Sequence, residues 1–141
     1  MDINYALFVE EGTIWVKIMK RYCATRDILK AFIVNGCIRS CFEQFYSQNK
    51  KIVIYGASEL ADIIIKLCKK EALSIYGICD KKVCKDGWKY LDYPIISIET
   101  LRNMQDTVVI IAAVGFEDEI KESLCNLGVE TLKTVEEVFR E

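Results

Sequence analysis

The feature that most constrains the fold is an alternation of apolar runs with helical patterns from residue 51 to the end of the chain. Residues 52–55 and the run "TVVIIAAV" at 107–114 are continuous β-forming segments. Each is followed by a stretch whose apolar residues recur at helical spacing. Strands that are apolar on both faces, with helices between them, are typical of a parallel sheet covered on both sides. The sequence therefore predicts an α/β fold.

The same patterns predict the individual elements and their arrangement. Strands are expected at residues 52–55, 74–79, near 94–96, at 107–114 and early in 129–141. Helices are expected at residues 59–70, after Ser97 as its cap, at 116–128 with Gly128 at the end, and at the C-terminus, while residues 81–94 form a polar excursion. Right-handed crossovers then give a small Rossmann-like, doubly wound sheet with strand order 3-2-1-4-5 and residues 52–55 in its interior.

A helical segment, residues 1–49, is expected to precede the Rossmann-like domain at 50–141, with the boundary at the polar stretch 47–50. The run "TRDILKAFIVNGCIRSCFEQFYSQ" predicts one long amphipathic helix capped by Thr25, with Asp27 in its first turn. Upstream, residues 5–22 leave two alternatives open. They form two short helices broken at Gly12, or a hairpin that turns at Glu11 and Gly12.

Composition excludes several classes of function. The net charge of −2 argues against general nucleic-acid binding. Seven cysteines, with no secretory signal and no apolar run long enough to span a bilayer, indicate free thiols and a cytoplasmic location. There is no histidine, so the chain can form no Ser-His or Cys-His pair and no His-ligated metal site. Cys37 and Cys41 lie four residues apart on the expected helix and are interpreted as core residues, so no metal site is predicted.

The turn after the first strand, "GASELA" at 56–61, raises two interpretations. When the turn is aligned with the dinucleotide motif G-x-G-x-x-G, Gly56 matches the first glycine, which permits the tight turn. Ser58 and Ala61 replace the other two glycines. A helix N-terminus there offers free N–H groups to an anion, and Ser58 has a hydroxyl to donate. Glu59, however, adds a charge that repels phosphate. The other interpretation is a strand–helix turn in which Ser58 is only the N-cap.

Two further residues follow strands that end at the same edge of the expected sheet. Asp80 lies at the end of the second strand, where a carboxylate binds ribose hydroxyls in dinucleotide sites. Its alternative role is to start the next turn. Gly115 follows the buried strand at 107–114 and lets a ligand approach the backbone closely, or simply forms a strand–helix turn.

A resemblance to a known family is carried by three stretches of the chain: "KIVIYGASELADIIIKLCKKEALSIYGICDKK", "YPIISIETL" and "TVVIIAAVGFEDEIKESLCNLGVE". Residues 50–131 resemble the Rossmann-like domain at the N-terminus of bacterial sugar acetyltransferases of the sialic acid and bacillosamine type. Similar domains occur in polysaccharide-biosynthesis dehydratases. The resemblance implies that a UDP-sugar binds through Gly56, Ala57, Ser58 and Asp80, with Gly115 nearby.

The chain also departs from that family. Glu59 and Leu60 stand where the family has a further glycine and often a histidine, and the hexapeptide-repeat catalytic domain is absent from this sequence. The expected function is a non-catalytic module that binds a nucleotide-diphosphate sugar in surface-glycan biosynthesis. The alternative is a ligand-free interaction or oligomerisation module with a vestigial site. A stand-alone NAD-dependent enzyme is a third, weaker hypothesis.

The N-terminal segment is also expected to form an interface. A core of this size leaves part of its apolar residues uncovered, and large apolar patches mark interfaces. The residues concerned are Phe8, Ile14, Trp15, Ile18, Phe32 and Phe45. We therefore expect a homo-oligomer, most simply a two-fold dimer, or a partner enzyme bound through residues 1–49.

Overall fold

The computed structural model describes residues 3–35, 38–56, 58–81, 89–129 and 131–139. Its elements, in chain order, are α1 (Ile3–Asn35), α2 (Arg39–Ser47), β1 (Lys51–Tyr55), α3 (Glu59–Lys70), β2 (Gly77–Cys79), β3 (Lys89–Tyr90), β4 (Tyr93–Pro94), α4 (Ile98–Arg102), β5 (Thr107–Ile111), α5 (Glu117–Asn126), β6 (Thr131–Thr134) and α6 (Val135–Val138). None of these helices is long and apolar enough to cross a membrane.

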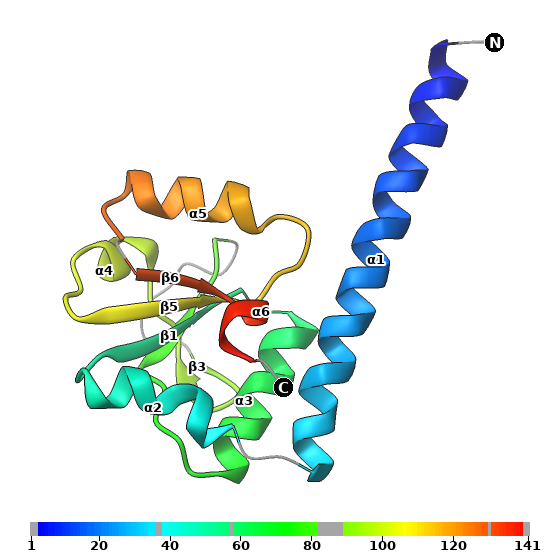
Figure 1. The fold of residues 1–141 in the computed structure, drawn as a ribbon. Helices are drawn as coiled ribbons and strands as arrows, with labels where there is room; N and C mark the ends of the chain where they lie inside the picture. Colours follow the sequence, from blue (N-terminus) through cyan, green and yellow to red (C-terminus); the bar gives the residue numbers. More distant parts are fainter. Residues whose placement is uncertain (1–2, 36–37, 57, 82–88, 130, 140–141) are drawn as a thin grey trace.

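The main sheet has four parallel strands in the order β2-β1-β5-β6 (Figure 1). In register, Val53 of β1 lies beside Gly77 of β2 on one side and Val109 of β5 on the other. The predicted α/β fold and the interior position of the first strand are therefore confirmed. The predicted third strand is reduced to a single parallel bridge between Ile78 and Ile95, next to β2.

The polar excursion contains a small hairpin that the sequence patterns did not predict. Strands β3 and β4 pair antiparallel, with Tyr90 opposite Tyr93. The two residues between the strands, Leu91 and Asp92, have positive φ angles of 48° and 72°. A two-residue hairpin turn needs this conformation, but it is usually supplied by Asn-Gly or Asp-Gly. Leu-Asp carries no such signal, which is why the hairpin was missed.

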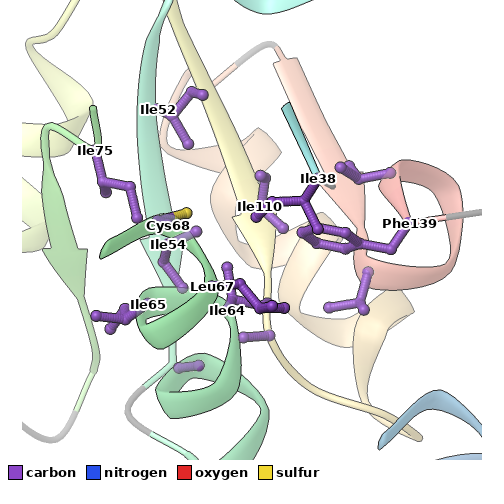
Figure 2. Close-up of a cluster of buried hydrophobic side chains, with 14 of the residues drawn as sticks. Ile38, Ile52, Ile54, Ile64, Ile65, Leu67, Cys68, Ile75, Ile110 and Phe139 are labelled. Carbon is purple, nitrogen blue, oxygen red and sulfur yellow. The ribbon is translucent and has the colours of Figure 1, made fainter. Parts of the chain in front are cut away.

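The core divides into two clusters, one on each face of the sheet. Because side chains alternate along a strand, Ile54 faces one cluster and Val53 the other. Helices α2, α3 and α6 cover the first face, and α4 and α5 cover the second (Figure 1). Figure 2 shows the first cluster, where side chains from β1, β5, α3 and the C-terminal turn meet: Ile38, Ile52, Ile54, Ile64, Ile65, Leu67, Cys68, Ile75, Ile110 and Phe139.

Several predicted helix ends are confirmed. Helix α3 spans the predicted residues, and the Ser97 hydroxyl caps α4 by accepting a hydrogen bond from the Thr100 backbone N–H at 3.1 Å. Gly128 follows α5 with a φ angle of +91°, a conformation that favours glycine. These ends depend on local side-chain and backbone preferences, so they can be read from short stretches of sequence.

The N-terminal predictions were partly wrong. Helix α1 runs without a break from Ile3 to Asn35, through Gly12, so neither the break nor the hairpin forms. Thr25 does not cap a helix, since it lies in the middle of α1 and is only 5% exposed. An interior glycine destabilises a helix by about 1 kcal/mol, which the many favourable residues around it outweigh.

The single long helix predicted from Thr25 onward is in fact two helices. Helix α1 ends at Asn35 and α2 begins at Arg39. The Glu71 carboxylate accepts hydrogen bonds from the backbone N–H groups of Ile38 and Arg39, at 2.7 and 3.1 Å, and so holds the start of α2. Of the two cysteines interpreted as core residues, Cys41 lies half-buried in α2 and Cys37 lies outside the described residues.

Candidate functional site

The candidate site is the carboxyl edge of the sheet between β1 and β5. The chain leaves β1 toward β2 on one side and later returns as β5 on the other, so the strand order reverses between β1 and β5. In open α/β sheets, ligands bind in the crevice outside this switch point. The loops that meet here follow β1, β2 and β5, and they hold the predicted site residues.

The first loop is held together by its own residues. Gly56 has a φ angle of +112°, and a Cβ atom there would lie 3.3 Å from the Ala112 carbonyl oxygen. The Ser58 hydroxyl donates a hydrogen bond to that same oxygen at 2.9 Å and accepts a longer one from the Ala61 N–H at 3.4 Å. The N-cap interpretation of Ser58 is therefore confirmed. Ala57 lies outside the described residues.

Asp80 lies beside this loop, as the sequence predicted. The Gly56 N–H donates a hydrogen bond of 2.8 Å to the carbonyl of Cys79, so the end of β2 is tied to the turn after β1. Asp80 is half-buried. On the hairpin, the Tyr90 hydroxyl donates a hydrogen bond to Asp62. Burial, followed by that hydrogen bond and by the negative charges of Asp62 and Asp80, raises the pKa of Tyr90 to about 12.

The loop after β5 is shaped around α1. Gly115 has a φ angle of +94°, and a Cβ atom there would lie 2.9 Å from Cγ2 of Ile18. The Gly115 N–H donates a hydrogen bond to the Glu117 carboxylate. The group beside Gly115 is therefore a side chain of the same protein, and the predicted approach of a ligand stays a prediction.

Helix α1 lies at this edge of the sheet and contacts the loop after β5 and the start of α3 (Figure 1). Arg21 forms ion pairs with Glu117 at 2.6 Å and with Glu136 at 2.9 Å. The Tyr22 hydroxyl donates a hydrogen bond of 2.8 Å to Glu59, in the first turn of α3. Trp15 packs edge-on against Phe116, with ring centroids 6.3 Å apart. The loop after β5 and the first turns of α3 and α5 are thus contacted by the protein's own helix.

Charge at this edge is mostly negative. A cavity of about 290 Å³ lies between α1 and the start of α5 and is lined by Arg21 and by Glu117, Asp118 and Glu119. Burial raises the pKa of Glu117, but hydrogen bonds from its own backbone N–H, from Arg21 and from Gly115 outweigh that effect and lower the pKa below its ordinary value. The hydrogen bonds that Arg21 donates to Glu117 and Glu136 raise its own pKa. Glu117 therefore stays ionised at the place where an anionic ligand would sit.

Sequence reasoning missed three residues of this edge, Ile18, Arg21 and Tyr22. The signal was present in the spacing of Ile18, Tyr22, Thr25 and Leu29, which places them on one side of α1. That side packs on α3, with Leu29 fully buried. In the ranges that the structure describes, no group of three or more metal-ligating side chains is present.

Comparison with known proteins locates part of the chain in a family. No curated protein matches the chain. A family model described as C2185-like, N-terminal, matches residues 48–135. The match includes both glycine loops and leaves out α1 and α2. Because it spans more than half of the 141 residues, the chain belongs to the C2185-like N-terminal family.

Proposed function

We propose that the chain is a non-catalytic protein-interaction module, in which α1 fills the ligand crevice of a Rossmann-like domain and presents its other side to a partner. The observation that carries the proposal is the contact of Ile18 with Gly115, at the switch point itself. In this proposal, Gly115 is glycine so that α1 can approach. The free thiols among the described cysteines agree with a cytoplasmic location.

Electrostatics also favours occupation by α1 over a phosphate. The N-terminus of a helix attracts anions because its free N–H groups and its dipole are positive there. At α3 and α5 this attraction is already used by Glu59 and Glu117 in the first turns. A diphosphate would have to approach these carboxylates and compete with the Arg21–Glu117 ion pair. Its binding would thus replace existing contacts rather than satisfy free groups.

The second candidate is the binding of a nucleotide-diphosphate sugar, in surface-glycan biosynthesis. The observation in its favour is that the bond from Gly56 to Cys79 places Asp80 beside the glycine turn, where a ribose acceptor is expected. This function requires α1 to move off the crevice. In that case α1 acts as a cover, and weakening its contact with Gly115 increases affinity.

Titration calorimetry with UDP-sugars, CMP-sugars, NAD and CoA separates the two candidates. The variants are Ile18→Asp, which loosens α1 from Gly115, and Asp80→Ala, which removes the expected ribose acceptor. We expect no binding at millimolar ligand by the wild type or by Ile18→Asp. Binding that strengthens in Ile18→Asp and weakens ten- to a hundred-fold in Asp80→Ala would establish the nucleotide-sugar site instead, since a hydrogen bond to a charged group is worth about 1.5–3 kcal/mol.

A further inference from the structure

The last described residues of the chain contact α1 at two separate points. Glu136, in the short helix α6, forms an ion pair of 2.9 Å with Arg21. Phe139, directly after α6, packs edge-on against Phe32, with ring centroids 6.4 Å apart. Arg21 and Phe32 lie about three helical turns apart, so they share one side of α1 and are separated by roughly 16 Å along its axis. We call residues 135–139 the C-terminal turn.

The C-terminal turn is itself fixed to the α/β domain. Phe139 is 2% exposed, and its ring also packs against Phe42 of α2, with centroids 5.7 Å apart. Figure 2 shows Phe139 in the first core cluster. Glu137 closes a capping box with Thr134 and forms an ion pair of 2.9 Å with Lys121 of α5. The C-terminal turn therefore connects α1 with α2, with α5 and with the core on the first face of the sheet.

The aromatic contact should hold α1 more strongly than the ion pair does. The side chains of Arg21 and Glu136 are both about half exposed, at 46% and 51%. Ion pairs this exposed are screened by water and salt and stabilise little. Phe139 is buried, and loss of a buried ring is far more costly because it leaves a cavity. We therefore expect Phe139 to make the main contribution and Glu136 a minor one.

The segments that meet at Phe139 all lie outside the family match. The match covers residues 48–135, so it leaves out α1, α2 and the part of the C-terminal turn after Val135. Phe32 comes from α1 and Phe42 from α2. Segments from the two sides of the matched region thus pack on one another as well as on the matched domain. Such a contact allows one segment to control the position of the other.

We propose that the C-terminal turn is a latch that holds α1 against the loop after β5 and the start of α3. With the turn in place, Ile18 stays on Gly115. Tyr22 likewise keeps its hydrogen bond to Glu59. When the turn leaves its place, α1 loses two points of contact and opens more often, since only its packing on α3 and on the loop then holds it. The inference rests on the proposed function, because it names what controls the position of α1 there.

Hydrogen exchange on the full chain tests the latch. Phe139→Leu keeps an apolar side chain in the core and removes the ring that reaches Phe32. In this variant, amides at residues 18–29 of α1 and at residues 112–119 should exchange about five-fold faster or more, because α1 opens more often.

Phe45→Leu is the matched control. Phe45 is nearly as buried, at 4% exposed, but its ring packs on Phe42 within α2. Both variants weaken the same core, so amides of β1 and β5 should respond alike in the two and report any loss of global stability. Exchange in α1 and the loop should stay at the wild-type rate in Phe45→Leu. Equal acceleration of α1 in the two variants overturns the proposal, and so does an acceleration in Phe139→Leu that is confined to the C-terminal turn.

A charge reversal on the exposed part of the turn is the test if Phe139→Leu does not fold. Glu136→Lys places a second positive charge beside Arg21 at the surface, so the core stays intact. Exchange in α1 and in the loop should accelerate about two-fold or more, and an unchanged rate overturns the proposal. Either failure leaves the proposed function in place, because its calorimetric test depends on Ile18 and Asp80.

Discussion

The α/β domain and helix α1 use their apolar residues in different ways. In the sheet, Ile54 and Ile110 are completely buried, and each is enclosed by strands and helices of the same domain. On α1, Leu29 is equally buried on one side while Met19 is more than half exposed on the other. The sheet domain thus covers its own core. Helix α1 packs one side against that domain and exposes apolar residues on another, so changes in the two regions should have very different consequences.

The largest expected effect contrasts the two regions directly. Ile110→Ala removes buried methyl groups from β5 and should lower the free energy of unfolding by about 2–5 kcal/mol. Met19→Ala removes a comparable amount of side chain from the exposed side of α1 and should change the free energy of unfolding by less than about 0.5 kcal/mol in dilute protein. Urea unfolding measures both. Similar losses would mean that α1 is packed on both sides.

Alanine substitutions at two glycines test the contact between α1 and the loop after β5. Gly115 and Gly128 have nearly the same φ angles, +94° and +91°, so alanine is equally strained at both. At Gly115 a Cβ atom also meets Ile18, whereas at Gly128 no atom lies within 4 Å. Gly115→Ala should therefore destabilise the fold by about 1–2 kcal/mol more than Gly128→Ala. In an Ile18→Ala background the difference should disappear, and its persistence would argue against the placement of α1.

A smaller effect is expected where α1 meets α3. Tyr22→Phe removes the hydroxyl that donates to Glu59 and leaves the ring in place. Because this bond is near the surface, the loss should be about 0.5–1 kcal/mol. Tyr76→Phe, on an exposed ring at the other end of the sheet, serves as the control and should be neutral. An equal change in both variants would show that the Tyr22–Glu59 bond contributes nothing.

The smallest effect is a dependence on alkaline pH. Burial, followed by the hydrogen bond to Glu59, raises the pKa of Tyr22 from 10.0 to about 12. A raised pKa means that the folded state keeps a proton that the unfolded state has lost. The stabilisation is therefore complete below pH 10 and is lost as the pH rises toward 12. The free energy of unfolding should fall less between about pH 8 and about pH 11 in Tyr22→Phe than in the wild type. An equal fall in both proteins would contradict the raised pKa of Tyr22.

Local patterns allowed much of the α/β domain to be predicted. The continuous apolar run of β5 and the run before Gly56 are strong signals, and the Ser58 and Ser97 caps are local features. The approach of Asp80 to Gly56 was also predictable, because the carboxyl ends of neighbouring parallel strands meet at one edge. The implied nucleotide-sugar ligand and the boundary at residue 49 remain predictions.

The packing of α1 on the loop after β5 was not predictable in the same way. The contact of Ile18 with Gly115 joins residues almost a hundred positions apart, and no local periodicity encodes it. Gly12 had the properties of a helix break, yet the residues around it continue the helix. The Leu91-Asp92 turn adopts a conformation that its residues rarely show, so the sequence contained no turn signal from which the hairpin could be predicted.

Hydrogen exchange on dilute protein tests most directly whether α1 occupies the crevice. Amides in residues 18–29 of α1 and in the loop at residues 112–119 should exchange slowly in the wild type. In Ile18→Asp both stretches should exchange about ten-fold faster or more, because one loosened contact opens both. Met19→Asp, on the exposed side of α1, should leave exchange in the loop unchanged. If Ile18→Asp accelerates exchange in α1 alone and the loop keeps its protection, α1 does not cover the crevice.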